Sequence, residues 1–213
     1  MSDGLRIGVL GGTFDPPHLG HLWLATLAAE ALQLDRVWFM PAAQPPHKLG
    51  RPMSAPADRE AMVRLAIAGD PHFELCAIEL QRGGPSFTVD SIGQLQGQRP
   101  APDQLLLLMA ADSLEQIGTW REPERLLELV EWGVGPRPGH WPVDRSVLAG
   151  RFGAAAARIH LIDGPALAVS SSEIRGRVAA GRTIRYLVPR AVEDLITDHG
   201  LYRERAARSI DPG

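Results

Sequence analysis

The chain has 213 residues, which is long enough to bury a full hydrophobic core and fits one large domain better than two small ones. Hydrophobic residues make up 45% and charged residues 22%, an ordinary balance for a soluble globular protein, and the longest apolar runs are far too short to cross a bilayer. A net charge of −3 gives no support for a nucleic-acid or membrane partner, so any anionic ligand must be bound by a local site.

Segments typical of strands alternate with segments typical of helices along the chain. Strands are expected at residues 6–10, 36–40, 73–78, 105–109, 132–135 and 158–162, where apolar, β-branched and aromatic residues gather. Helices are expected over the periodic apolar residues from Leu19 to Ala31 and then at 57–68, 88–95, 123–131, 171–180 and 189–199. Residues 41–56, which are rich in proline, are expected to form a loop.

This alternation predicts an α/β protein with a single doubly wound parallel sheet covered by helices on both faces. The sequence contains no internal repeat and no domain linker, so one domain is expected over residues 1–202. The charged tail at 203–213 has no apolar period and is expected to be solvated or disordered. No secretory signal is evident, and Cys76, the single cysteine, excludes an internal disulfide and suits a reducing cytoplasm.

The first loop carries the motif Gly-Gly-Thr-Phe-Asp-Pro-Pro-His-Leu-Gly-His at residues 11–21. Two glycines permit close backbone approach at the end of the first strand, and two prolines suit a turn and a first helical position. On a helix, the spacing of His18 and His21 puts both rings on one face, beside free backbone amides that attract anions. The motif therefore predicts a phosphate site. A zinc site is disfavoured, because two histidines with one distant cysteine are a poor ligand set.

A second motif, Val-Ser-Ser-Ser-Glu-Ile-Arg, occupies residues 169–175. Its serine hydroxyls, helix-start amides and Arg175 could converge on one anion. An ordinary structural role is also open, because Ser170 and Glu173 have the spacing of a capping box. The single lysine of the chain, Lys48, lies on the proline-rich loop, which is expected to emerge at the same edge of the sheet as the first motif.

The two motifs together resemble the paired signature of the nucleotidyltransferase superfamily. Within it, residues 6–202 resemble the bacterial nicotinate-nucleotide adenylyltransferases, a resemblance supported by the segments Met-Pro-Ala-Ala-Gln-Pro-Pro-His-Lys at 40–48, Arg-Gly-Gly-Pro-Ser-Phe-Thr-Val-Asp-Ser at 82–91, residues 111–114, Thr119-Trp120 and Arg137-Pro138-Gly139. The resemblance implies a Rossmann-like nucleotidyltransferase fold. It also implies transfer of the adenylyl group of ATP, with Mg²⁺ bound to the ATP, to nicotinate mononucleotide in the cytoplasm.

The resemblance further implies a role for particular residues. His18, His21 and Arg175 would be catalytic, and ATP would be bound by Gly11, Gly12, Thr13, Phe14, His18, His21, Asp112, Ser171, Ser172 and Arg175. The acceptor would be bound by His47, Lys48, Thr88, Trp120 and Arg137, with the nicotinate ring stacked on Trp120 and its carboxylate near the backbone amides around Thr88. No protein ligand for the metal is expected, and the sequence leaves open whether the chain forms a homo-oligomer.

Several alternatives stay open at the level of sequence. Trp120 could be a core aromatic residue, Thr88 a helix cap and Asp112 an N-cap. Phe87, Ala110 and Pro136 depart from the usual family pattern, and they bear on substrate preference more than on reaction class. The acceptor could instead be nicotinamide mononucleotide or pantetheine phosphate. A regulator that binds nucleotides without catalysis is disfavoured, because both histidines and Arg175 are present.

Overall fold

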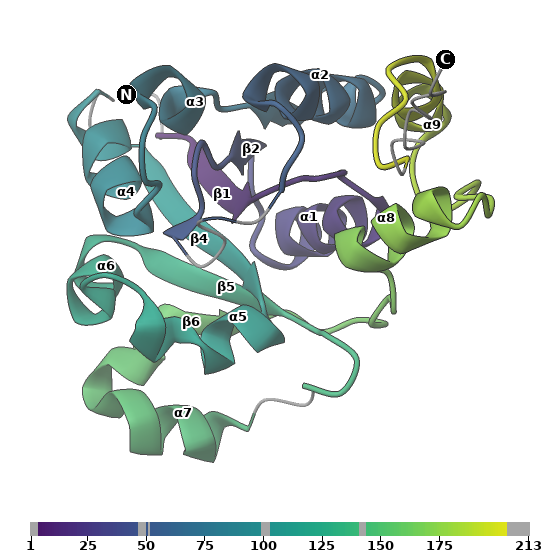
Figure 1. The fold of residues 1–213 in the computed structure, drawn as a ribbon. Helices are drawn as coiled ribbons and strands as arrows, with labels where there is room; N and C mark the ends of the chain where they lie inside the picture. Colours follow the sequence, from purple (N-terminus) through teal and green to yellow (C-terminus); the bar gives the residue numbers. More distant parts are fainter. Residues whose placement is uncertain (1–3, 47–49, 51, 99–102, 141–143, 204–213) are drawn as a thin grey trace, which may run out of the picture.

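The computed structural model describes residues 4–46, 50, 52–98, 103–140 and 144–203, and it contains one parallel sheet covered by helices (Figure 1). The sheet order is β3-β2-β1-β4-β5-β6. The strands are β1 (Arg6–Gly12), β2 (Arg36–Pro41), β3 (Phe73–Leu75), β4 (Gln104–Ala110), β5 (Glu131–Gly135) and β6 (Ile159–Leu161). All five strand pairings are parallel, which confirms the predicted α/β fold class.

The helices of the described residues lie between these strands, except for α8 and α9, which follow the last strand. They are α1 (Leu19–Ala31), α2 (Pro56–Ile67), α3 (Ile78–Arg82), α4 (Thr88–Gly97), α5 (Ala111–Glu115), α6 (Pro123–Leu129), α7 (Arg145–Phe152), α8 (Ser171–Ala179) and α9 (Arg190–Asp198), with 3₁₀ helices η2 (Ile117–Thr119) and η3 (Gly153–Arg158). The sequence pattern missed α3, α5 and α7. It was also wrong about residues 76–78, because the third strand ends at Leu75 and Ile78 already begins α3.

The central strands are buried on both faces, and their side chains alternate between two hydrophobic clusters. Leu107 and Met109 of β4 point into a cluster with α4 and α6, whereas Leu106 and Leu108 point into a cluster with α1 and α2. A period of two residues sends successive side chains of a strand to opposite faces of its sheet. The almost continuous apolar sequence of β4 therefore reflects a strand covered on both sides.

A third, smaller cluster packs α8 and α9 against α2. Ile174 of α8 and Val192 and Ile196 of α9 pack with Met62 of α2, while Tyr202 is a partly buried neighbour of this cluster. The helix pair α8 and α9 lies at one side of the molecule, close to α2 and α1 (Figure 1). This packing brings the second sequence motif, at the start of α8, next to the first.

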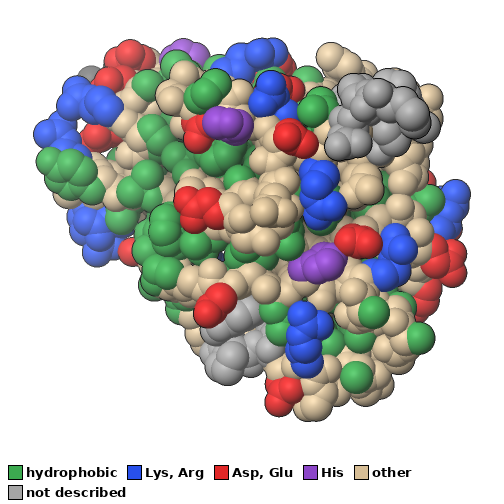
Figure 2. All heavy atoms as spheres, turned by 180° about the vertical axis from the view of Figure 1, so that it is seen from behind, with side chains coloured by type: hydrophobic (Ala, Val, Ile, Leu, Met, Phe, Trp, Pro, Cys, Tyr) green, Lys and Arg blue, Asp and Glu red, His purple; other side chains and the backbone are tan. Residues whose placement is uncertain are grey.

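Acidic and basic side chains are interspersed on the face seen in Figure 2, which is turned away from the viewer in Figure 1. This mixture matches the small net charge of −3. Among the described residues, no helix combines the length and apolar character needed to cross a membrane.

Candidate active site

The candidate active site lies at the carboxyl ends of β1 and β4. These strands are neighbours, with Leu10 opposite Leu108, and β2 lies on the other side of β1. The direction of winding therefore changes between β1 and β4, and open parallel sheets bind ligands in the crevice at such a switch point. A cavity of about 740 Å³ opens at this place.

Most of the predicted site residues in the described part of the chain line this cavity. They are Gly11, Gly12, Thr13, His18, His21, Thr88, Asp112, Trp120, Arg137, Ser171 and Ser172. Phe14 is instead buried, with its ring at 4.9 Å from the ring of His21, and Arg175 is directed at the backbone of the first motif. His47 and Lys48 lie outside the described residues, although the preceding residues Pro45 and Pro46 line the cavity.

The two histidines of the first motif are in contact at the start of α1. His18 is the N-cap residue, with extended backbone, and only His21 lies within the helix, so helical spacing alone does not place the two rings together. Their rings stack with centroids 3.7 Å apart. Gly20 makes room for this arrangement, because a Cβ atom there would lie 3.1 Å from the ring of His18.

The hydrogen bonds of His21 identify its ring donor. The backbone N–H of His18 donates to Nδ1 of His21 over 3.2 Å. A ring nitrogen that accepts a hydrogen bond carries no proton, so the proton of the neutral ring is on Nε2. His21 can therefore donate from Nε2 to a phosphate oxygen.

His18 is buried, and its electrostatic surroundings disfavour the charged ring. Burial, together with the positive charge of Arg137, lowers the pKa of His18 to about 4. Its Nδ1 atom has no hydrogen-bond partner among the described residues. Buried polar atoms normally have partners, so an orphaned ring nitrogen at a cavity wall fits a site that binds a polar ligand. In the free protein, His18 is thus a neutral hydrogen-bonding group near pH 7.

The start of α8 is tied directly to the first motif. Ser170 is the N-cap of α8, and its hydroxyl accepts the backbone N–H of Glu173, so this half of the predicted capping box is present. The hydroxyl of Ser171 donates to the carbonyl of Pro16 over 2.8 Å. Arg175 donates to the carbonyl of Asp15 over 2.7 Å and to the hydroxyl of Ser172 over 3.2 Å. The two motifs therefore form adjacent walls of one cavity.

Arg137 connects these walls to a third segment. Its Nη1 atom donates to the carbonyl of Val169, just before α8, and its Nε atom lies 3.4 Å from Oδ2 of Asp112 in α5. Asp112 is not the N-cap of α5, because Ala110 holds that position. Arg137 thereby adds a partly buried positive charge beside His18 and Asp112.

The opposite wall is formed by the start of α4 and by the residues after η2. Thr88 is the first residue of α4, and Phe87 holds the N-cap position, so the alternative of Thr88 as the cap was wrong. Trp120 lines the cavity and also packs against the hydrophobic core. A place in the core therefore does not exclude contact with a ligand.

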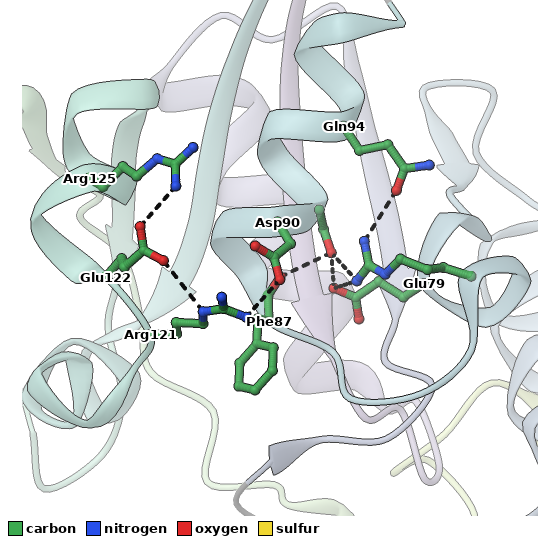
Figure 3. Close-up of polar contacts among 9 residues, drawn as sticks. Glu79, Phe87, Asp90, Gln94, Arg121, Glu122 and Arg125 are labelled. Atoms are coloured by element: carbon green, nitrogen blue, oxygen red, sulfur yellow. Dashed lines mark hydrogen bonds and ion pairs between the residues drawn. The ribbon is translucent and has the colours of Figure 1, made fainter.

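Arg121 was not selected from the sequence, yet it lines this wall of the cavity. Its guanidinium lies 4.9 Å from the centre of the Phe87 ring and forms ion pairs with Asp90 at 3.2 Å and Glu122 at 3.4 Å (Figure 3). Arg125 binds the other oxygen of Glu122. The only sequence signal for Arg121 is its place directly after Trp120.

Glu79 of α3 is a second cavity residue that sequence reasoning missed. Its side chain is buried, and the hydroxyl of Ser91 donates to it over 2.5 Å. Burial raises the pKa of Glu79, while hydrogen bonds from Ser91 and Ser86 and the charge of Arg82 oppose this rise. No periodicity marks Glu79, because α3 is only five residues long.

Comparison with known proteins assigns the chain to a family. Residues 9–177 match the cytidylyltransferase-like family. A relative from Thermomicrobium roseum, named "probable nicotinate-nucleotide adenylyltransferase", is 48% identical, with 93% of this chain and 92% of the relative covered. A relative of the same name from Roseiflexus sp. is 47% identical, with 92% of this chain and 98% of the relative covered.

A solved structure has the same fold. The nicotinic acid mononucleotide adenylyltransferase of Plasmodium falciparum, solved in complex with NaAD, superposes with a TM-score of 0.78 at 20% identity, covering 93% of this chain and 97% of that one. The two relatives are 48% and 47% identical to this chain over almost its full length. The chain therefore belongs to the nicotinate-nucleotide adenylyltransferase family within the cytidylyltransferase-like proteins.

Proposed function

We propose that the protein transfers the adenylyl group of ATP to nicotinate mononucleotide, giving nicotinate adenine dinucleotide and pyrophosphate in NAD biosynthesis. The observation that carries the proposal is the joining of the two motifs around one cavity, where stacked His18 and His21 face the start of α8. The family to which the chain belongs supports the same reaction.

In the proposed reaction, a phosphate oxygen of the mononucleotide attacks the α-phosphorus of ATP. A new P–O bond forms there, and the bond from the α-phosphorus to the oxygen that bridges it to the β-phosphorus breaks, so that pyrophosphate leaves. No protein nucleophile is needed. The protein contributes by holding the reactants in line and by hydrogen bonding to the oxygens on which negative charge builds up.

The phosphate chain of ATP would lie between the two motifs. Gly11, Gly12 and Thr13 supply backbone at the end of β1, and His21 donates from Nε2. Ser171 and Ser172 provide hydroxyls and amides at the start of α8. Arg175 holds this start against the first motif and adds a positive charge, and Asp112 would contact the nucleotide from α5.

The acceptor would occupy the opposite wall. Its ring would stack on Trp120, with its carboxylate near the amides at Thr88, and Arg137 would lie toward its phosphate. His47 and Lys48 are proposed to bind phosphate from the proline-rich loop. Phe87 and Arg121, which stack on each other, would enclose the ring from the side.

Mg²⁺ is proposed to enter the site on the triphosphate. Within the described residues no group of three or more His, Cys, Asp or Glu side chains is placed to hold a metal ion. The proposed ion would be coordinated mainly by phosphate oxygens and water, as Mg²⁺ usually is. When bound, the ion would neutralise charge on the triphosphate.

A pyrophosphate-release assay with ATP and Mg²⁺ tests the proposal against three acceptors: nicotinate mononucleotide, nicotinamide mononucleotide and pantetheine phosphate. We expect the highest kcat/KM with nicotinate mononucleotide. A preference for pantetheine phosphate or the amide would overturn the assigned acceptor. Absence of release with every acceptor, from protein that is shown to be folded, would overturn the proposed catalysis.

A further inference from the structure

Arg59 of α2 is the one arginine that is buried among the described residues, with no exposed surface. Its guanidinium makes four hydrogen bonds, all to backbone carbonyls. Nη1 donates to Thr13 over 3.0 Å and to Ala42 over 2.5 Å, Nη2 donates to Ala43 over 3.1 Å, and Nε donates to Ser54 over 3.2 Å. One side chain therefore binds the backbone of three separate segments.

Two of these segments border the cavity. Thr13 belongs to the first motif, and Ala42 follows directly on β2; both line the cavity. The amide of Ala42 also donates to the carbonyl of Gly12, and the amide of Ala43 donates to the hydroxyl of Ser86. Arg59 is thus placed behind the cavity wall, where the loop after β1 meets the loop after β2.

Asp15 extends this arrangement to the end of the described chain. Asp15 is buried, and its Oδ1 atom accepts the hydroxyl of Tyr202 over 2.6 Å, while Oδ2 accepts the amide of Ser54 over 3.3 Å. The carbonyl of Asp15 accepts a hydrogen bond from the guanidinium of Arg175. Burial lowers the pKa of Arg59, and the negative charge of Asp15 opposes this effect.

The chemistry of the guanidinium explains why an arginine occupies this place. A buried charge is costly unless it is fully hydrogen-bonded, and well-packed apolar residues often stabilise a core as well or better. Packing alone therefore does not require an arginine. The guanidinium is a rigid, planar fork of N–H donors, so it fixes the relative positions of the carbonyls that it binds. A lysine has a similar charge but no such fork.

We propose that Arg59 is a positioning residue for the reaction: by binding the carbonyls of Thr13, Ala42 and Ala43, it fixes the distance between the two loops that form the cavity wall. This inference rests on the proposed adenylyl transfer. Tyr202 supports the same geometry by holding Asp15, whose backbone is bound by Arg175 of the second motif. Tyr202, near the end of the described residues, is in this way connected to the phosphate-binding wall.

Arg59→Lys is the main test, because it keeps the charge and removes the fork. A displacement of about 1 Å in a reacting group can reduce a rate on the order of 100-fold, so we expect kcat to fall about 10- to 100-fold, with smaller changes in the KM values. Activity is to be measured well below the unfolding temperature of each variant. The matched control is Arg64→Lys on the same helix, where Arg64 is exposed and paired only with Glu60 among the described contacts.

Tyr202→Phe provides a milder variant in case Arg59→Lys does not fold. It removes only the hydroxyl and leaves a buried carboxylate oxygen short of a donor, so we expect kcat to fall roughly 3- to 10-fold. Hydrogen exchange offers a readout that does not need activity. In both variants, peptides covering residues 10–16 and 41–46 should exchange faster than in the control.

Three results separate the outcomes. Wild-type kcat in folded Arg59→Lys, together with unchanged exchange, would overturn the positioning role, because charge alone would then suffice. The positioning role would also be overturned if activity fell only in proportion to the fraction of unfolded protein. If the wild type transfers no adenylyl group to any acceptor, the proposed function fails, and faster exchange in the two loops still tests whether Arg59 fixes them.

Discussion

Different kinds of contact hold the two sides of the cavity. The phosphate wall consists of the first motif and the start of α8, and the acceptor wall consists of the start of α4 with Trp120 and Arg121. On the phosphate side, bonds to backbone carbonyls join distant segments: Ser171 to Pro16, Arg175 to Asp15 and Arg59 to Thr13. On the acceptor side, Arg121 is held by ion pairs with the exposed carboxylates of Asp90 and Glu122 (Figure 3). Exposed ion pairs contribute little and are screened by salt, whereas the three hydrogen bonds of the phosphate side are partly buried and are better shielded from water.

This difference suggests that the two walls have different roles in the reaction. A pre-organised phosphate wall lowers the barrier of a reaction in which charge moves among phosphate oxygens, so its residues should act on kcat. A wall made of an aromatic ring, helix-start amides and exposed ion pairs should act on which acceptor binds. Substitutions on each wall should therefore change different kinetic constants.

The largest effect is expected for His21→Ala. Loss of one pre-organised donor to a developing oxyanion costs on the order of 100- to 1000-fold in rate, so kcat should fall by about that factor. The fold should persist, because His21 is only partly buried. Steady-state kinetics with thermal unfolding as a control measure both. A variant with near-normal turnover would remove His21 from the mechanism.

A dependence of stability on pH should follow from His18. The pKa of this residue is about 4 in the folded protein, below its ordinary value of 6.5, so the unfolded chain takes up the proton first. Stability that is present above pH 6.5 is therefore lost as the pH falls toward 4, by on the order of 3 kcal/mol. Denaturant unfolding across this range should show a smaller loss for His18→Gln than for the wild type. Parallel losses in the two proteins would contradict the burial of a neutral His18.

Trp120→Ala should separate binding of the acceptor from binding of ATP. Stacking of a base on an aromatic side chain contributes roughly 1–3 kcal/mol, so the KM for nicotinate mononucleotide should rise about 10-fold or more. The KM for ATP should change much less. Trp120→Phe, which keeps a ring, is the control for loss of core packing, and equal changes in both KM values would argue against stacking.

The smallest effect is expected for Arg121→Ala. Exposed ion pairs are worth roughly 0.2–1 kcal/mol, so the KM for the acceptor should rise only about two- to fivefold, and less at high salt. Arg125→Ala is the matched control, since Arg125 shares Glu122 but does not line the cavity. Identical kinetics for the two variants would show that Arg121 has no contact of its own with the acceptor.

The sequence predicted the architecture well where apolar patterns are long. The period of β1, α1 and β4 identified them nearly to the residue, because buried strands and helices require these patterns. Helices α3 and α5, with five residues each, are too short to show a period. Helix α7 did carry a signal, since Asp144 caps it by accepting the amide of Ser146.

Residues of the site that lie in short sequence motifs were predictable, and residues that act through distant contacts were not. In the phosphate wall, the two histidines are close to each other in sequence, and so are the serines, so each motif could be recognised. The positions of Arg59 and Tyr202 depend on contacts between segments far apart in the chain, such as the 187 positions between Tyr202 and Asp15. A local pattern contains no information on such contacts. Nor did it show that burial would keep the ring of His18 neutral.

One measurement tests the division between the two walls most directly: the ratio of kcat/KM for nicotinate mononucleotide to that for nicotinamide mononucleotide, compared between the wild type and His21→Ala. In His21→Ala we expect kcat to fall by about two orders of magnitude and the ratio to stay within about twofold of the wild-type ratio. A ratio that collapses toward one, or a turnover that survives the substitution, would contradict this division.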